Sequence, residues 1–132
     1  MDNGFKYYGQ ALEDKRLCEI FHSKKKGKYI ELGAIDGILY SNTKFFEDNL
    51  DWSGILIEPN IYQYKKLVIN RPNNYLFNNL VSDIDEELEF KYFVDDYAGV
   101  SGVTKTLPKE HYVGFFNVIK APQGSIKMKP VT

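Results

Sequence analysis

The chain has 132 residues, a length that fits one domain, and we expect a single domain over residues 1–132. The net charge of -1 gives no electrostatic reason to expect a nucleic-acid partner. The single cysteine, Cys18, excludes an internal disulfide and a cysteine-based metal cluster, and we predict no metal site. No apolar run reaches the ~18 residues that a membrane span needs, and no signal peptide is recognisable. These features predict a cytoplasmic protein with no membrane partner.

The first third of the chain predicts a helix, a strand and a second helix. Apolar residues recur at helical spacing over residues 10–21. Residues 29–32 (YIEL) form a short run that stops at a glycine, which predicts a strand. A loop with two glycines then leads to a helix whose N-cap we expect to be Ser41 or Asn42.

The next elements continue this alternation. The apolar run 55–57 predicts a strand buried on both faces of a parallel sheet. A helix is expected over residues 60–70, and a third strand over residues 75–77. Strands that alternate with helices through short connections are typical of βαβ units. We therefore predict an α/β protein with a mainly parallel sheet in three layers.

After residue 81 the pattern changes. Residues 88–93 alternate between apolar and polar side chains, which predicts a strand with one solvated face. Glycine and proline then recur at short intervals, so we expect only short strands and turns. The candidates for these strands are residues 113–119 and 126–128.

The segment 30–37 combines the end of a strand with a glycine-containing loop. Glycine lets the backbone approach a ligand closely. In doubly wound sheets ligands bind outside the carboxyl ends of the strands, where this loop is expected to lie. Glu58 follows the next predicted strand, at the position of an acid that accepts hydrogen bonds from a ribose. Together these features predict a nucleotide-type cofactor site.

The charges of the loop bear on which cofactor it binds. The glycine spacing is not that of a dinucleotide loop or a P-loop, and Glu31 and Asp36 would repel phosphate. S-adenosylmethionine carries no phosphate and has a cationic sulfonium, so the two acids favour it over NAD or ATP. One alternative stays open: Gly33 and Gly37 make only a tight turn, and Asp36 caps a helix.

Four segments and a short upstream motif resemble the FkbM-type S-adenosylmethionine-dependent methyltransferases. The segments are Tyr29–Thr43 (YIELGAIDGILYSNT), Phe45–Glu47 (FFE), Trp52–Asn60 (WSGILIEPN) and Asn79–Asp83 (NLVSD), and the upstream motif is Tyr8–Gln10 (YGQ). The similarity covers roughly residues 7–104. It implies a Rossmann-like methyltransferase fold, and methyl transfer to a hydroxyl of a sugar or another small-molecule acceptor.

The resemblance also implies roles for particular residues. Those expected to shape the methionine end of the cofactor site are Glu31, Gly33, Ala34 and Gly37, with Asp36 as the second acid of the loop and Ser41 and Asn42 near the carboxylate. Glu58 would hold the ribose and Asn60 would lie by the adenosine. Ser82 and Asp83 would border the adenine, although Asp83 is equally well explained as a turn residue, and Asn42 as a helix cap.

Two departures from the family pattern limit these expectations. Ile35 stands where the family usually has Asn, which removes one polar cofactor contact. The family continues to a strand with an Asp-x-Glu-Gly motif that this sequence lacks, so we expect a domain incomplete on its C-terminal side. No catalytic base is identified. The alternative function is a catalytically degenerate cofactor-binding or interaction module, completed by a partner chain or by self-association.

Overall fold

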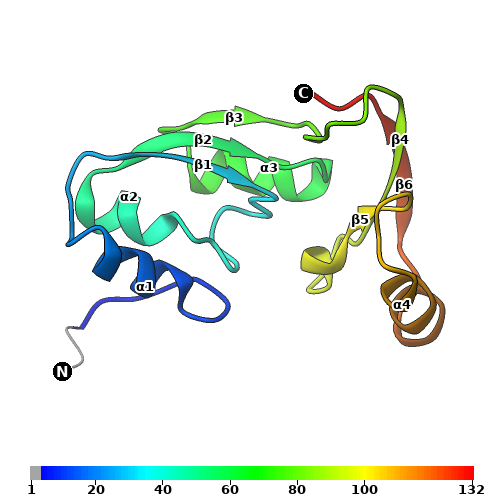
Figure 1. Cartoon of the computed structure of the whole chain (residues 1–132), viewed down its shortest axis with the longest axis horizontal. Helices are drawn as coiled ribbons and strands as arrows, with labels where there is room; N and C mark the ends of the chain where they lie inside the picture. The colour runs from blue at the N-terminus through cyan, green and yellow to red at the C-terminus, as the bar shows by residue number, and fades with distance from the viewer. Residues whose placement is uncertain (1–3) are drawn as a thin grey trace.

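The structure, a computed structural model, describes residues 4–132 apart from the side chains of residues 112, 115 and 118. The strands form two small sheets, one parallel in the order β1-β2-β3 and one antiparallel in the order β5-β4-β6 (Figure 1). The elements in chain order are α1 (Glu13–Ile20), β1 (Lys28–Leu32), α2 (Lys44–Leu50), β2 (Ser53–Ile57), α3 (Ile61–Asn70), β3 (Tyr75–Phe77), β4 (Leu88–Tyr92), η1 (Ala98–Val100), β5 (Gly102–Val103), α4 (Lys109–His111), η2 (Tyr112–Ile119) and β6 (Gly124–Met128). The chain is therefore a mixed α/β protein, as predicted.

The parallel sheet confirms the strand and helix alternation of the first half. A helix lies in each connection between neighbouring strands, α2 between β1 and β2, and α3 between β2 and β3. Such a crossover is needed because a parallel strand must start again from the same end of the sheet. In the register, Ile30 stands beside Ile55, and Ile55 stands beside Tyr75.

Among residues 4–132, helices cover only one face of this sheet. Leu56, which is fully buried, contacts Leu67 of α3 and Ala34 of the glycine loop. Phe45 and Phe46 of α2 pack against Tyr29 on the same face, and α1 packs against α2 (Figure 1). The expectation of three layers is thus wrong for residues 4–132, because both crossover helices lie on one side of the strands.

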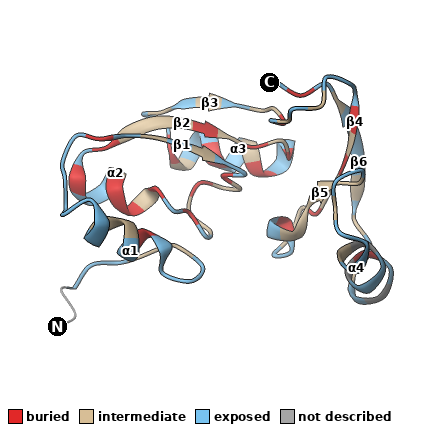
Figure 2. Cartoon of the chain, in the orientation of Figure 1, coloured by how far each residue is buried: buried red, intermediate tan, exposed pale blue. Residues whose placement is uncertain are grey.

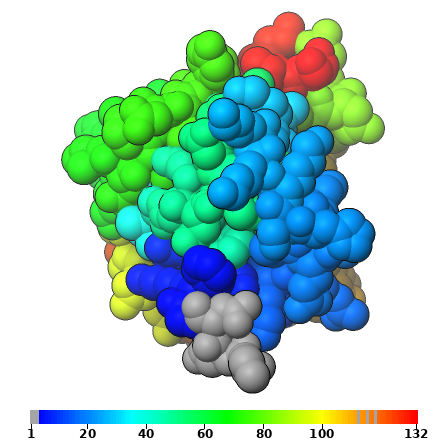
Figure 3. All heavy atoms as spheres, turned by 90° about the vertical axis from the view of Figure 1, so that its left-hand side faces the viewer, coloured from blue at the N-terminus to red at the C-terminus, as the bar shows by residue number. Residues whose placement is uncertain are grey.

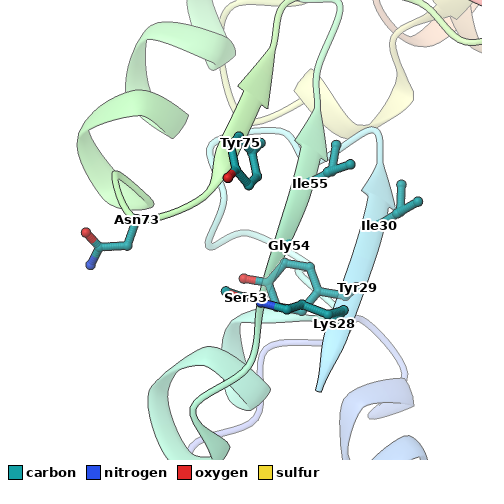
Figure 4. Close-up of a pocket in the computed structure, with 8 residues that line it drawn as sticks. All are labelled: Lys28, Tyr29, Ile30, Ser53, Gly54, Ile55, Asn73 and Tyr75. Atoms are coloured by element: carbon teal, nitrogen blue, oxygen red, sulfur yellow. Dashed lines mark hydrogen bonds between the residues drawn. The ribbon is translucent and has the colours of Figure 1, made fainter. Parts of the chain in front are cut away.

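The opposite face of the parallel sheet is apolar and open. Ile30 and Tyr75 are 67% and 73% exposed, and Leu32 and Phe77 are also exposed (Figure 2). Figure 4 shows Ile30, Ile55 and Tyr75 side by side on three strands, at a hollow of about 490 Å³. The prediction that the strand around residues 55–57 is buried on both faces is therefore wrong. An apolar run indicates that both faces of a strand favour burial. Whether the second face is buried depends on other elements of the chain, and here no helix covers it in the part of the chain that the structure describes.

The second half forms the antiparallel sheet. β4 confirms the predicted strand at residues 88–93, and β6, paired with it through Phe90 and Ile126, confirms the candidate at 126–128. The candidate strand at 113–119 is wrong, because these residues belong to the π-helix η2. Periodicity cannot distinguish a short apolar strand from a buried helix, and here Phe116 packs edge-on against Phe93. Within the described part of the chain, every helix is too short or too polar to cross a membrane.

The antiparallel sheet is joined to the carboxyl end of the parallel strands. The side-chain amide of Asn60 donates a hydrogen bond of 2.7 Å to the carbonyl of Phe93. Val131, near the C-terminus, donates its backbone N–H to Leu80 over 2.9 Å and forms an isolated parallel bridge with Val81. In Figure 3 the red C-terminal residues accordingly lie beside the yellow-green segment that follows β3. These contacts bring the loop after β4 close to the glycine loop.

Candidate ligand-binding site

A cavity of about 530 Å³ opens at the carboxyl end of β1. This volume is within the range of small-molecule sites. One wall is the end of β1 with the glycine loop, and the other is the segment around the short 3-10 helix η1. The lining residues are Gln10, Glu31, Leu32, Gly33, Ile35, Tyr40, Asn42, Asp96, Tyr97, Gly99 and Val100.

The glycine loop, which leads from β1 to α2, has four residues in the left-handed backbone region: Gly33 (φ 67°), Ile35 (φ 52°), Gly37 (φ 83°) and Tyr40 (φ 58°). A Cβ added to Gly33 would meet no atom within 4 Å, so this backbone faces open space in the cavity wall. A Cβ on Gly37 would lie 2.6 Å from Arg71, so Gly37 is required for packing beneath the loop. Ile35 is strained, because a β-branched side chain rarely adopts a positive φ.

Glu31 is held in the cavity wall by the segment that precedes α2. Its carboxylate accepts hydrogen bonds from the backbone N–H of Asn42 (2.8 Å), the hydroxyl of Ser41 (3.0 Å) and the hydroxyl of Thr43. The N-cap of α2 is Thr43, so the prediction of Ser41 or Asn42 at this position is wrong by one or two residues. Ser41 nevertheless caps the helix, because its Oγ accepts the N–H of Lys44 over 3.0 Å.

Asp36 acts within the turn and does not line the cavity. Its Oδ1 accepts the backbone N–H groups of Ile38 (2.9 Å) and Leu39 (2.7 Å). This geometry is that of a side chain that stabilises a tight turn. The structure therefore gives Asp36 the turn of the alternative interpretation, but Asp36 does not cap a helix, because α2 begins only at Lys44. Ala34, which is buried, packs beneath the loop against Leu56.

Glu58 lies buried behind the glycine loop rather than in the cavity wall. Its two carboxylate oxygens accept the backbone N–H of Ile35 (2.7 Å) and that of Asn60 (2.8 Å). Burial raises the pKa of Glu58 to about 7, and the two backbone hydrogen bonds oppose this rise. In this structure Glu58 braces the strained loop against the end of β2.

The other predicted adenosine-side residues also have structural partners. Asn60 caps α3, since its Oδ1 accepts the N–H of Tyr62 over 3.1 Å, while its amide bonds to Phe93. Ser82 accepts the N–H of Ile84 over 3.1 Å, in a turn that leaves Asp83 exposed. Of all the predicted site residues, the cavity wall contains Glu31, Gly33 and Asn42.

The sequence interpretation missed the residue that supports the loop from below. Arg71, which follows the helix predicted over residues 60–70, is fully buried and pairs with Glu47. Its guanidinium also donates to the carbonyl of Gly37 (2.9 Å) and to the hydroxyl of Tyr29 (2.8 Å). Burial raises the pKa of Tyr29, so its hydroxyl stays protonated. No periodicity in the sequence marks Arg71, because its partners are far away along the chain.

Asp96 and Tyr97 were missed as well, although they complete the cavity. The sequence around them indicates only turns, and no local pattern places that turn opposite the glycine loop. Gln10 also lines the cavity, and the upstream motif Tyr8–Gln10 was the one signal for it.

The described residues of the cavity wall carry negative and polar groups but no positive charge. The wall carries the carboxylates of Glu31 and Asp96, two tyrosine rings and two amides, and among the described lining residues there is no Lys or Arg. Such a surface suits a neutral or cationic ligand and disfavours phosphate. In comparisons with known proteins, no family model, curated sequence or solved structure matches this chain.

Proposed function

We propose that the chain binds S-adenosylmethionine in this cavity and is a methyltransferase of the FkbM type, with a Rossmann-like fold. The acceptor would be a hydroxyl of a sugar or another small molecule. The observation that carries the proposal is the cavity itself, which opens at the carboxyl end of β1 and is bounded by Glu31 and Gly33. Ligands of parallel α/β sheets bind at this end of the strands.

The residues present fit the cofactor in size and in charge. A volume of about 530 Å³ accommodates a molecule of this class. The open space at Gly33 allows the backbone to approach the ligand, as the family resemblance implies. The sulfonium that supplies the methyl group is cationic, and Glu31 and Asp96 provide negative charge in the wall.

Preorganisation is the contribution that the chain's own residues make. Hydrogen bonds from Ser41 and Asn42 fix the Glu31 carboxylate, and Glu58 fixes the backbone of Ile35. Groups held in place before a ligand arrives lose little entropy on binding. Methyl transfer depends mainly on holding the donor and the acceptor in line, so a rigid loop supports this activity.

A second function, an interaction module, is favoured by a different observation. The apolar face that bears Ile30 and Tyr75 is open, and so are the edges formed by β1 and β3. Exposed apolar patches and unpaired strand edges are typical of surfaces that bind another chain. This reading does not require the cavity to hold a cofactor.

Calorimetric titration with S-adenosylmethionine, its demethylated product and NAD separates these functions. We expect the first two ligands to bind and NAD not to bind. Gly33→Ala should weaken S-adenosylmethionine at least about tenfold, because a methyl group would occupy the space that the backbone leaves for the ligand. Gly4→Ala is the matched control, since Gly4 also has a positive φ (69°) and no atom within 4 Å of an added Cβ.

The outcomes point in different directions. Binding of NAD alone would contradict the methyltransferase proposal. If none of the three ligands binds, the interaction module is favoured. Equal losses in Gly33→Ala and Gly4→Ala would show that backbone strain, and not the cavity, explains the effect.

A further inference from the structure

The second wall of the cavity comes from the antiparallel half of the molecule. Asp96 and Tyr97 lie just before η1, and both side chains are exposed. Gly99 and Val100 of η1 line the same cavity. The wall is thus built by a segment, residues 95–101, that is about sixty residues from the glycine loop along the chain. We call this segment the arm.

The arm is held in a defined position. The carbonyl of Phe93, at its base, accepts the side-chain amide of Asn60 over 2.7 Å, and the N–H of Phe93 donates to Ser101 Oγ over 3.0 Å. Within the arm, Asp95 accepts the N–H of Tyr97 over 3.0 Å and pairs with Lys120 over 2.8 Å. The arm is therefore a fixed part of the site, tied at both ends.

Two neighbouring acids of the arm have different surroundings. The Lys120 ammonium beside Asp95, together with the N–H of Tyr97, holds the pKa of Asp95 below its usual range, and Asp95 does not line the cavity. Asp96 does line it, together with Glu31 of β1. The described lining residues include no Lys or Arg, so the two carboxylates give the lining itself a negative charge. The Lys120 ammonium that pairs with Asp95 lies outside this lining, 5.1 Å from the Tyr97 ring centroid, and it also interacts electrostatically with Asp96.

We propose that Asp96 is a specificity-determining residue that makes the cavity prefer a cationic ligand to its neutral counterpart. This inference rests on the proposed function. It identifies the positive charge of the cofactor as the property that the arm recognises. S-adenosylmethionine carries a sulfonium, whereas its demethylated product carries a neutral thioether at the same atom. A carboxylate in the wall attracts the first and gives no such attraction to the second. The ring of Tyr40, which lines the same cavity, favours a cation in the same way. The Tyr97 ring already has the Lys120 ammonium 5.1 Å from its centroid.

The preference has a consequence for turnover. In methyl transfer the acceptor hydroxyl oxygen would form a bond to the methyl carbon as the S–C bond breaks, and the hydroxyl proton would pass to solvent. The electron pair of the broken bond would stay on the sulfur, so its positive charge would disappear. The attraction to Asp96 is lost at that moment, so the arm favours exchange of the product for a new cofactor molecule. A positively charged donor is thus retained and its neutral product is released.

The test compares Asp96→Asn with Asp85→Asn, which changes in the same way an exposed acid that pairs with Lys129 and does not line the cavity. Calorimetry measures the affinities of both variants for S-adenosylmethionine and for its demethylated product, at low and at high salt. We expect Asp96→Asn to weaken S-adenosylmethionine roughly twofold to fivefold and to leave the product unchanged, with the difference reduced by salt. Asp85→Asn should keep the wild-type ratio of the two affinities, and Asp96→Glu, which keeps the charge, should retain most of the preference.

Each alternative result is informative. Equal changes for both ligands, or no change in Asp96→Asn, would overturn the role of Asp96 while the proposed cofactor stands. Failure of the wild-type chain to bind S-adenosylmethionine would overturn the proposed function and Asp96's role with it. A circular-dichroism melt of each variant shows whether the fold is intact, and Asp96→Glu provides a charged variant if Asp96→Asn does not fold.

Discussion

The two faces of the parallel sheet have similar sequences and opposite surroundings. On one face Tyr29 and Leu56 pack under α2 and α3, and Leu56 is fully buried. On the other face Ile30 and Tyr75 are mostly exposed, although they are as apolar as their neighbours. The difference shows that apolar character alone does not determine burial. The helices that follow each strand decide which face becomes core.

The buried acid Glu58 and the candidate ligand-binding cavity both lie at the carboxyl edge of the sheet, between its two faces. Glu58 lies there on the covered side and braces the glycine loop. The cavity opens at the same edge, between that loop and the arm. Three experiments compare how much the covered face, this edge and the open face contribute to the free energy of unfolding.

The largest effect is expected for the covered face. Leu56→Ala removes a fully buried side chain and should lower the free energy of unfolding by about 2–5 kcal/mol. Ile30→Ala, on the neighbouring strand but on the open face, should lower it by about 1 kcal/mol or less. Urea denaturation of both variants measures the difference. A loss in Ile30→Ala as large as that in Leu56→Ala would show that the open face is covered in solution, and would break the comparison.

A smaller, pH-dependent effect is expected at Glu58. Its pKa is about 7 in the folded chain against 4.5 for the unperturbed carboxyl group. The folded state therefore binds the proton more tightly, so stability should fall as the pH rises from about 4.5 to about 7, by up to roughly 3 kcal/mol. Urea denaturation at pH 5 and pH 8 measures this slope. Glu58→Gln cannot titrate and should lose the dependence. A wild-type slope of the opposite sign would mean that the backbone hydrogen bonds to Glu58 outweigh its burial.

The smallest effect is expected in the glycine loop. Ile35 has a φ of 52°, and Asn tolerates this conformation better than a β-branched residue does. Ile35→Asn should raise the free energy of unfolding by about 1 kcal/mol. Ile38→Asn is the control, because Ile38 lies in the same loop and is not among the described residues with a positive φ. Equal changes in the two variants would show that the backbone strain at Ile35 is not relieved.

Much of the first half of the fold could be predicted from local patterns. The strand at 29–32, the helix after residue 60 and the strand at 75–77 are all confirmed. They could be predicted because glycine, asparagine or proline marks their ends in the sequence. The error at 113–119 has a local cause, since a short apolar run fits a strand and a buried helix equally well. Burial on both faces was a different kind of error, because it depends on a layer that no local pattern specifies.

For the candidate site, the sequence predicted the backbone conformation of the glycine loop better than the hydrogen-bond partners of the polar side chains around it. Gly33 and Gly37 have the positive φ angles that glycine permits, and Glu31 lies in the wall of a cavity at the end of β1. Asp36, Ser41 and Asn60 are engaged in turn and helix caps, which their residue types equally favour. Cap and ligand contact use the same short polar side chains, so composition cannot separate them.

The sequence by itself determined the βαβ order, the position of the glycine loop and the acids around it, because these depend on residues close together in the chain. Only the tertiary structure decided that Arg71 supports the loop, that Glu58 is buried behind it, and that Asp96 faces the cavity. These outcomes depend on contacts between distant segments. Their free energies come from burial and from geometry in three dimensions, which a linear pattern does not contain.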